Sequence, residues 1–383
     1  MNLEEKTLQE VCALITDGAH NSPKSVDVGL PMASVKDLTS FGINLDTCRL
    51  ISKQDFDKLV RMNCQPVKGD VLIAKDGASA LDTVCELKES IEVVLLSSVA
   101  ILRPDLKKIT SSYLRYYLDS PTTRKYMKSG FITGAAIPRV VLEDFKKIII
   151  RFPTLLVQRK IASVLSAYDD LIENNTHRIR ILEQMAHTLY HDWFGKVYAQ
   201  SLPEGWNVVK MGDVADIQWG DTSVTKLSYV DDGYTAYSAS GPDGKLAYYD
   251  FNRKGIVLSA IGANCGKIWF AHGKWSCIKN TIRFWATTKK VSTEYLFFVT
   301  SDESFWPKRG AAQPFISQGD ARAIIIVCPK QDLIDKFTSF TSDALEQIDA
   351  LERKNVNLRR TRDLLLPRLV SVEVGVDEME LAV

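Results

Sequence analysis

The chain has 383 residues and a formal net charge of +1, with 48 lysines and arginines against 47 aspartates and glutamates. Its 45% hydrophobic and 25% charged residues are typical of a folded globular protein and exclude a disordered or fibrous one. The length favours at least two globular units. The near-neutral charge excludes a uniformly basic surface, so any nucleic-acid contact has to be local.

Nothing in the sequence predicts a membrane segment or a secreted protein. It contains no run of about 18 uncharged apolar residues, and residues 1–6 do not resemble a basic, apolar leader. The seven cysteines are an odd number without a C-x-x-C pair, which favours reduced, buried thiols. We therefore expect a cytoplasmic protein that has no membrane partner.

Residues 1–152 form the first predicted domain, of mixed α/β type. Short β-rich runs at 71–74, 93–102 and 148–152 are separated by glycines and turn residues, and 111–118 is a predicted helix. Residues 153–200 then change to helical spacing, because apolar residues recur every three or four positions from Ile161 onward. The predicted seam of this helix contains Ile161, Leu165, Ile172, Ile179, Leu182 and Leu189.

Residues 201–328 form a second mixed α/β domain, with β-rich runs at 256–261 and 324–327, and residues 329–370 form a second helix. The apolar stripe of that helix is interrupted by Asn355, and we expect it to end at Pro367 because proline breaks a helix. An acidic tail, 371–383, follows. The second seam contains Phe337, Ile348, Leu351, Leu358 and Leu365, with Phe340 and Ala344 on the same stripe.

An internal repeat relates the two domains and their helices. The pentapeptide Gly-Ala-Ala-Ile-Pro at 134–138 recurs as Gly-Ala-Ala-Gln-Pro at 310–314, and the match continues until Pro153 aligns with Pro329. Upstream, 68–74 matches 254–260, so that Ala74 aligns with Ala260. The chain is therefore two copies of one unit, each a globular segment followed by a long helix.

The two apolar stripes are predicted to pack against each other. A helix of roughly 35 residues with one apolar face would be exposed in water, and antiparallel pairing within the chain buries both faces. The alternative is that each helix packs on its own globular segment. The expected fold is α+β, with two repeated α/β domains separated by an antiparallel intramolecular coiled coil. A spacer of roughly 50 Å would then hold the two domains apart, which suits two half-sites on DNA.

The chain resembles the specificity subunits of type I restriction-modification systems over nearly its whole length. Leu-Pro-Glu-Gly-Trp at 202–206 followed by Met-Gly-Asp-Val at 211–214 is similar to the start of a target recognition domain in that family. Three segments resemble the central conserved helix of that family: Gln-Arg-Lys-Ile-Ala at 158–162, Asp-Asp-Leu-Ile at 169–172, and residues 182–194. Residues 364–369 resemble the usual ending of its members. The first copy lacks the Leu-Pro-x-Gly-Trp motif, and the second has Asp335-Lys336-Phe337 where Gln-x-x-Ile is usual.

The resemblance implies a DNA reader without a catalytic site of its own. Each globular segment would be a target recognition domain that reads one half of a split target in double-stranded DNA. The conserved helices would dock two methyltransferase (modification) subunits, with two restriction/translocase subunits as optional further partners. S-adenosylmethionine, ATP and magnesium are expected only on those partners, and no cofactor or metal on this chain.

Two motifs that could indicate nucleotide or metal binding are incomplete in this sequence. Gly262-Ala263-Asn264-Cys265-Gly266-Lys267 has one residue too few for a phosphate-binding loop and no following Ser or Thr, so we predict no ATP site. His187 and His191 share a helix face, but the segment lacks the glutamate of H-E-x-x-H and a third ligand. We favour a solvated or partner-facing surface there. No methylase or nuclease motif is found in the sequence.

Candidate DNA contacts are cationic, amide and aromatic residues in the loops of each domain, because arginine and amide side chains recognise base edges and cations bind phosphates. The resemblance places the loop at 262–267, and its counterpart at 75–78, near DNA. The candidates are Lys24, Lys36, Lys75 and Arg139 in the first copy, and Lys226, Tyr237, Lys267, Arg309 and Gln313 in the second. We expect Gln313 to touch a base edge. The alternative function is a non-catalytic coiled-coil scaffold that binds protein partners.

Overall fold

The computed structural model describes residues 3–133, 138–195, 202–310 and 312–372. The chain divides into two compact units, each built from two separate stretches of sequence. Unit 1 comprises Met1–Asn174 and Asn355–Val383, and unit 2 is Asn175–Lys354. Two 40-residue helices, α6 (Leu155–Phe194) and α10 (Gln331–Val370), each contribute one half to either unit. The remainder of each unit is called its head.

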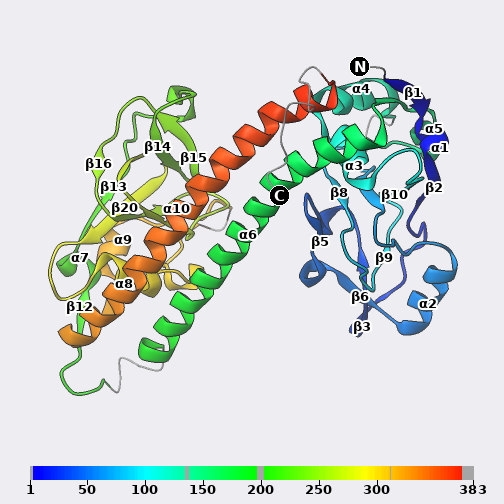
Figure 1. Cartoon of the computed structure of the whole chain (residues 1–383). Coiled ribbons are helices and arrows are strands. Elements are labelled where there is room, and N and C mark those ends of the chain that lie inside the picture. The colour runs from blue at the N-terminus through cyan, green and yellow to red at the C-terminus, as the bar shows by residue number, and fades with distance from the viewer. Residues whose placement is uncertain (1–2, 134–137, 196–201, 311, 373–383) are drawn as a thin grey trace. The chain divides into compact units, whose positions relative to one another are not determined.

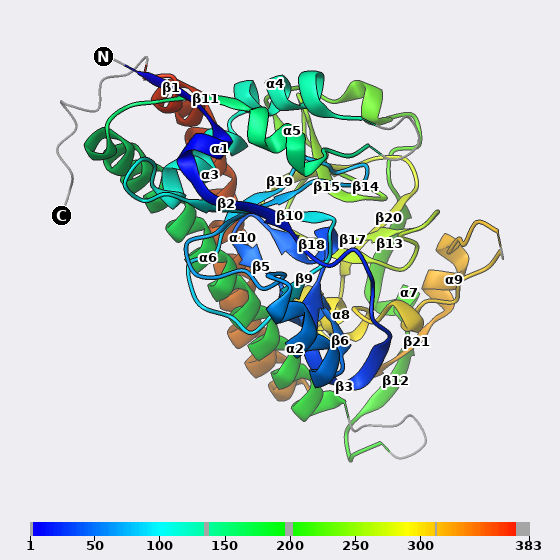
Figure 2. The same cartoon turned by 90° about the vertical axis from the view of Figure 1, so that its right-hand side faces the viewer.

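The head of unit 1 is built on an antiparallel four-stranded sheet in the order β2-β10-β7-β8. A second sheet, β6-β3-β9, and a short pair, β4-β5, extend it, and β1 pairs with β11. Helices α4 and α5 lie at the end of the head opposite α2 and β6 (Figures 1 and 2). The strands are β1 (Glu4–Thr7), β2 (Cys12–Asp17), β3 (Ser25–Ala33), β4 (Leu38–Thr39), β5 (Gly42–Ile43), β6 (Arg49–Ile51), β7 (Val71–Ala74), β8 (Val84–Glu86), β9 (Val94–Leu95), β10 (Val99–Pro104) and β11 (Ile149–Phe152). The helices are α1 (Leu8–Val11), α2 (Lys53–Arg61), α3 (Ser111–Asp119), α4 (Pro121–Phe131) and α5 (Leu142–Lys147), with 3-10 turns η1 (Val35–Asp37) and η2 (Leu45–Thr47).

The head of unit 2 repeats this plan. Its antiparallel sheet has the order β13-β20-β17-β18, a second sheet has the order β15-β14-β19-β16, and β12 pairs with β21. The strands are β12 (Asn207–Lys210), β13 (Ala215–Trp219), β14 (Tyr234–Ser238), β15 (Gly241–Leu246), β16 (Phe251–Asn252), β17 (Gly255–Ser259), β18 (Ile268–Ala271), β19 (Lys274–Cys277), β20 (Thr281–Ala286) and β21 (Ile325–Cys328). The helices are α7 (Met211–Val214), α8 (Thr293–Val299) and α9 (Gln318–Ala323), with 3-10 turns η3 (Lys226–Ser228) and η4 (Glu303–Phe305). The equal strand order confirms two repeated α/β heads.

The structure corrects the register of the repeat by one residue. Ala74 pairs with Val99 across the sheet of unit 1, and Ser259 pairs with Thr281 at the same place in unit 2. Ala74 therefore corresponds to Ser259 and not to Ala260. Both central strands, β7 and β17, are buried along their whole length. A strand that is buried on both faces has no alternation of apolar and polar residues from which its register can be read.

The long helices pack antiparallel, as predicted. In unit 1 the first half of α6 meets the last half of α10, so that Ile161 and Leu165 share a buried cluster with Leu366 and Leu369. In unit 2 the last half of α6 meets the first half of α10, and Leu182 and Leu189 pack on the buried cluster that contains Phe337 and Ile348. Both clusters also contain head residues. The helices therefore pair with each other as predicted, and each also packs with one half on its own globular segment and with the other half on the globular segment of the other copy.

Two expectations about the second seam are wrong. Pro367 lies inside α10, which continues to Val370. Leu366, Leu369 and Val370 are 6% exposed or less, and burying such side chains offsets the loss of one backbone hydrogen bond near the helix end. Phe340 lies at the edge of the seam, in place of its buried centre, and is 46% exposed. The predicted strand at 93–102 is two strands, β9 and β10, and the first long helix begins at Leu155, inside the range 153–200 predicted for it.

The other predicted seam residues are buried or half-buried, including Ile172, Ile179, Leu351, Leu358 and Leu365. The predicted domain limits at 152, 200, 328 and 370 stay predictions, and the acidic tail lies almost wholly outside the described residues. All seven cysteines are free thiols. Of the helices in the described chain, none is long and apolar enough to cross a bilayer.

Candidate nucleic-acid interface

Both heads have a loop that follows the central strand and is hydrogen-bonded to a short hairpin. In unit 1 the Gly77 amide donates to the Pro138 carbonyl at 2.9 Å, and the Val140 amide donates to the Lys75 carbonyl at 2.9 Å. In unit 2 the Gly262 amide donates to the Pro314 carbonyl at 3.0 Å, and the Ile316 amide donates to the Ala260 carbonyl at 2.9 Å. The same backbone bonds therefore hold both copies of the repeated pentapeptide.

The glycine of each loop is required by its backbone conformation. Gly77 has a φ of 92° and Gly262 a φ of 103°, in the region where a side chain is strained. Each hairpin closes by a pair of mutual backbone bonds, between Thr133 and Arg139 in unit 1 and between Arg309 and Phe315 in unit 2. Residues 134–137 and 311 lie outside the described residues. In each copy the repeated pentapeptide thus lies between two residues that pair with each other, and its last residue is bonded to the loop after the central strand.

The structure brings some predicted DNA contacts together at these loops. Arg139 is an exposed residue at the base of the first hairpin, and Arg309 and Gln313 are exposed on the second. Lys267 is exposed in the loop that follows Gly262. Lys308 was not predicted, although it precedes Arg309; its side chain packs beside Gly266 in that loop. A run of neighbouring cations, Lys308-Arg309, was the signal available in the sequence.

Other candidates are exposed but lie elsewhere in the heads. Lys24 precedes β3 and Lys36 lies in η1 of unit 1. Lys226 in unit 2 forms an ion pair with Asp243, which also accepts a hydrogen bond from Tyr229. Arg309 likewise pairs with Asp320. Both of these cations would have to exchange an existing carboxylate partner for a phosphate or base.

Two candidates are buried. Lys75 is 7% exposed, and its ammonium lies 3.3 Å from Asp17 and 3.4 Å from Asp76. Tyr237 is also 7% exposed, and its hydroxyl donates to the Phe270 carbonyl at 3.4 Å. Burial raises the pKa of Tyr237, and the nearby carboxylates of Asp349 and Glu352 raise it further. In the sequence these two residues could not be distinguished from exposed loop residues.

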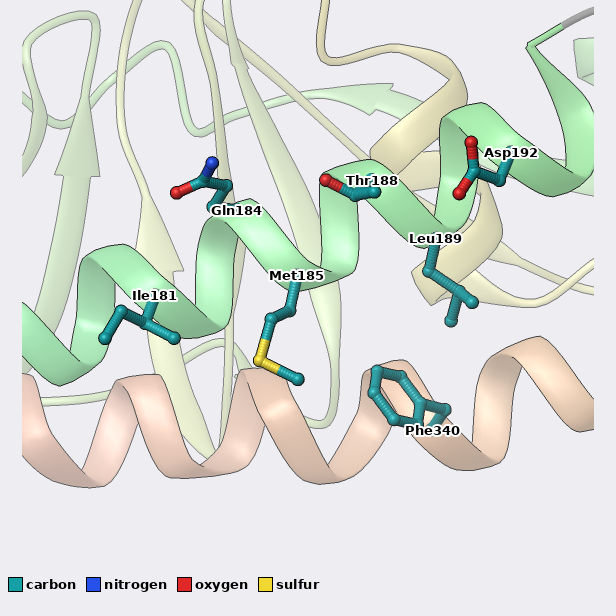
Figure 3. Close-up of a pocket in the computed structure, with 7 residues that line it drawn as sticks. All are labelled: Ile181, Gln184, Met185, Thr188, Leu189, Asp192 and Phe340. Atoms are coloured by element: carbon teal, nitrogen blue, oxygen red, sulfur yellow. The ribbon is translucent and has the colours of Figure 1, made fainter.

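An apolar groove lies between the two long helices within unit 2 (Figure 3). Ile181, Met185 and Leu189 follow one side of α6, and Phe340 reaches from α10 toward them. The groove has a volume of about 380 Å³. Ile181, Met185 and Phe340 are 42%, 49% and 46% exposed. Such a cluster of half-exposed apolar side chains is typical of a surface that binds another protein.

The described residues offer no evident centre for catalysis. No group of three or more histidines, cysteines, aspartates and glutamates within them is arranged to hold a metal ion. His187 packs edge to face on Phe298 at 5.1 Å between ring centres. Burial raises the pKa of Cys85 to about 12 and that of Cys277 to about 12, so these thiols are not activated nucleophiles.

Comparison with known proteins agrees with this architecture. The family described as type I restriction modification DNA specificity domain matches residues 2–184 and 203–354. The MjaIX specificity subunit of Methanocaldococcus jannaschii is 25% identical over 308 residues, which cover 71% of each chain. The putative type I specificity subunit S.MpnORF365P of Mycoplasma pneumoniae is 24% identical over 57% of this chain and 85% of its own.

A solved structure supports the fold. The type I restriction-modification S subunit from M. genitalium superposes with a TM-score of 0.66 over 96% of both chains, at 17% sequence identity. At that identity the likeness concerns the fold alone. The family match, in contrast, covers both heads and most of the helices. The chain is therefore a member of the type I restriction-modification DNA specificity family, whose specificity subunits recognise the DNA target and are not catalytic.

Proposed function

We propose that each head reads one half of a split target in double-stranded DNA through its hairpin and the loop that anchors it. The observation that carries this proposal is the duplication of the anchor: the same two backbone bonds hold the hairpin in unit 1 and in unit 2. Rigid attachment to a sheet limits the entropy that a reading loop loses on binding. The repeated pentapeptides differ in sequence, Gly-Ala-Ala-Ile-Pro against Gly-Ala-Ala-Gln-Pro, as two different half-sites would require.

The residues predicted to contact DNA fall into an exposed group and a buried group. Exposed cations at the hairpins, Arg139, Lys267 and Arg309, are suited to phosphates or guanine edges, and Gln313 is suited to an adenine edge. Lys24, Lys36 and Lys226 would add phosphate contacts at the periphery. Lys75 and Tyr237 are buried, and for them a supporting role inside the head fits better than direct contact.

The long helices are proposed to dock two methyltransferase subunits, with restriction subunits as optional further partners. The groove of Ile181, Met185, Leu189 and Phe340 has the apolar stripe at helical spacing that receives an amphipathic helix. S-adenosylmethionine, ATP and magnesium would then belong to the partners. We infer that the complex works in the cytoplasm, where the genomic DNA is accessible to it.

The decisive experiment maps methylated adenines in a host genome with and without this chain, in the presence of its methyltransferase partner. We expect a bipartite motif that disappears with the chain. Replacing the hairpin of unit 2 should alter one half of the motif and leave the other half unchanged. A motif that is continuous, or that survives loss of the chain, would contradict the proposal and favour a protein scaffold.

The same map tests whether the helices set the distance between half-sites. Inserting one turn into both helices adds about 5.4 Å to each, which is between one and two base-pair steps. The preferred gap should lengthen accordingly. An unchanged gap would show that the helices do not act as the spacer.

A further inference from the structure

A partly open pocket of about 210 Å³ on unit 2, with the exposed residues Glu183 and Glu352 in its lining, has no role in the proposed DNA contacts. It is lined by residues of α6, α8 and α10 and of strands of the head. Aromatic side chains form much of its wall, including Trp269, Phe270, Phe297 and Phe298, and the carboxylates of Glu183 and Glu352 line it as well. The volume is below the roughly 300–1,000 Å³ of pockets that hold drug-sized ligands. It fits a small molecule or a single side chain.

The equivalent place in unit 1 is identified by the repeat. Helices α3 and α8 begin alike, because Thr110 caps the amide of Tyr113 and Ser292 caps the amide of Tyr295. Arg115 and Tyr116 therefore correspond to Phe297 and Phe298. On the long helices, the alignment of Pro153 with Pro329 matches Asp169 with Leu345 and Ala186 with Arg362. A set of charged residues in unit 1 thus corresponds to aromatic and small residues around the cavity of unit 2.

In unit 1 this place is filled by guanidinium groups of the chain itself. Arg115 is 4% exposed, lies 4.4 Å from the ring centre of Tyr116 and donates to Asp169 at 2.6 Å. Arg362 donates to the other oxygen of Asp169 at 2.5 Å. Unit 2 has Phe297 in place of Arg115 and Ala186 in place of Arg362, so both guanidinium groups are missing and an alanine leaves space.

The cavity of unit 2 retains the features that attract a cation. No lysine or arginine of the described chain lines it, and neither Glu183 nor Glu352 has an ion-pair partner within that part of the chain. Burial raises the pKa of Glu352, and the carboxylates of Asp349 and Glu183 raise it further. Aromatic faces bind cations through their negative electrostatic potential.

We propose that this cavity binds a guanidinium group supplied from outside the chain, either by a small molecule or by an arginine side chain of the methyltransferase subunit. The group would stack on the aromatic wall and pair with Glu183 and Glu352. In doing so it would occupy the place that Arg115 and Arg362 fill in unit 1. The ligand follows from the cavity and the repeat and does not depend on the proposed DNA contacts.

The test is calorimetric titration of the full chain with agmatine, a guanidinium on a short alkyl chain, with neutral N-butylurea as the matched control. We expect agmatine to bind and N-butylurea not to bind. Glu352→Gln and Glu183→Gln should each weaken agmatine binding about tenfold or more. Asp192→Asn, which removes a carboxylate that lines the separate groove of Figure 3, should leave it unchanged.

A second variant tests whether a loss of agmatine binding could come from misfolding. Ala186→Arg restores from within the guanidinium that unit 1 has at the equivalent position, and it should abolish agmatine binding while the protein remains folded by circular dichroism. Equal binding of agmatine to the parent chain, Ala186→Arg and Glu352→Gln would overturn the proposal. So would equal binding of agmatine and N-butylurea.

The two sources of the guanidinium are distinguished by adding the methyltransferase subunit. If the ligand is a small molecule, agmatine binding persists in the complex. If it is an arginine of the subunit, agmatine binding is lost in the complex, and Glu352→Gln weakens assembly of the two proteins. If the chain alone does not bind agmatine and Glu352→Gln leaves assembly unchanged, the cavity has no guanidinium ligand and the proposal fails.

Discussion

The two units share the strand order of their main sheets but stabilise the junction of head and helices by different means. In unit 1, Asp169 on α6 accepts hydrogen bonds from Arg115 and Tyr116 of α3 and from Arg362 of α10. In unit 2 a cluster of rings in edge-on, tilted and stacked contacts is formed by Tyr190, Phe194, Tyr295, Phe298 and Phe337. One fold therefore tolerates a buried ionic junction or an aromatic one.

The two units therefore should respond differently to substitutions at equivalent positions of this junction. A buried ion pair is sensitive to loss of one partner, because the remaining charge is left without compensation. An aromatic cluster loses packing and leaves a cavity when one ring is removed. Since each unit takes its helices from both copies of the repeat, a change in one copy can affect the junction of either unit.

The largest effect is expected when the ionic junction of unit 1 is broken at its centre. Asp169→Leu, which introduces the residue found in unit 2, leaves the buried Arg115 without a carboxylate and leaves Arg362 with Asp363 alone. We expect unit 1 to lose about 3–5 kcal/mol of unfolding free energy, measured by denaturant unfolding. The triple variant Asp169→Leu, Arg115→Phe, Arg362→Ala introduces the unit 2 residue at all three charged positions and should recover most of this loss. If the triple variant is no more stable than the single one, the two junctions are not equivalent.

A recognition test compares the two hairpins. Gln313→Ala should cost about 1–3 kcal/mol of discrimination at one base pair of the half-site read by unit 2. Arg139→Ala, on the hairpin of unit 1, should leave that base pair unaffected and alter binding at the other half-site. Methylation assays on substrates with single substitutions measure both effects. Loss of discrimination at the same half-site in both variants would mean that the hairpins do not read separate halves.

The pH dependence of stability should also separate the units. Burial raises the pKa of Asp169, but Arg115, Arg362 and Tyr116 outweigh it, so that the net pKa lies below the usual value. The stability from this lowered pKa is present above the unfolded value, about 3.9, and is lost as the pH falls through the folded pKa. The raised pKa of Glu352 acts oppositely in unit 2, since protonation on acidification favours the folded state. When unfolding is measured from pH 7 to pH 3, the unfolding free energy of unit 1 should fall as the pH falls. In the triple variant this decrease should be smaller. An equal acid response in the triple variant would assign the loss to other carboxylates.

The smallest effect is expected for an exposed ion pair at the same junction. Lys88 of the head of unit 1 lies 2.7 Å from Asp170 of α6, and the two side chains are 48% and 60% exposed. Lys88→Ala should cost less than about 1 kcal/mol and less still in high salt, because exposed pairs are screened. Comparison with Asp169→Leu would show how much burial changes the contribution to stability of two neighbouring carboxylates on one helix. A cost as large as that of Asp169→Leu would be inconsistent with this view.

Much of the architecture was predictable because it leaves periodic signals. The helical spacing of Ile161, Leu165 and Ile172 predicts a helix with one buried face, and the structure has all three fully buried. The pentapeptides at 134–138 and 310–314 identify the repeat. The central strands β7 and β17 were located correctly, but their register was misjudged because every residue of both is buried.

The candidate site was less predictable, because exposure of a single side chain depends on neighbours distant in sequence. Lys75 and Lys267 both occupy a loop after a central strand, yet Lys75 is buried beside Asp17 and Lys267 is exposed. Phe340 belongs to the apolar stripe of α10 by spacing, but it lines a groove because α6 does not cover it. The spacing of apolar and charged residues along one stretch of sequence does not show which side chains another segment will cover.

The sequence by itself determined the duplicated plan, the two long amphipathic helices and the family, since each rests on residue spacing or on a motif within one stretch of chain. Only the tertiary structure decided that each unit combines halves of both helices, and that the equivalent junctions hold buried guanidinium groups in one unit and an aromatic cavity in the other. The physical reason is that burial and pairing arise between segments as far apart as Arg115, Asp169 and Arg362. No local spacing relates such residues before the chain has folded.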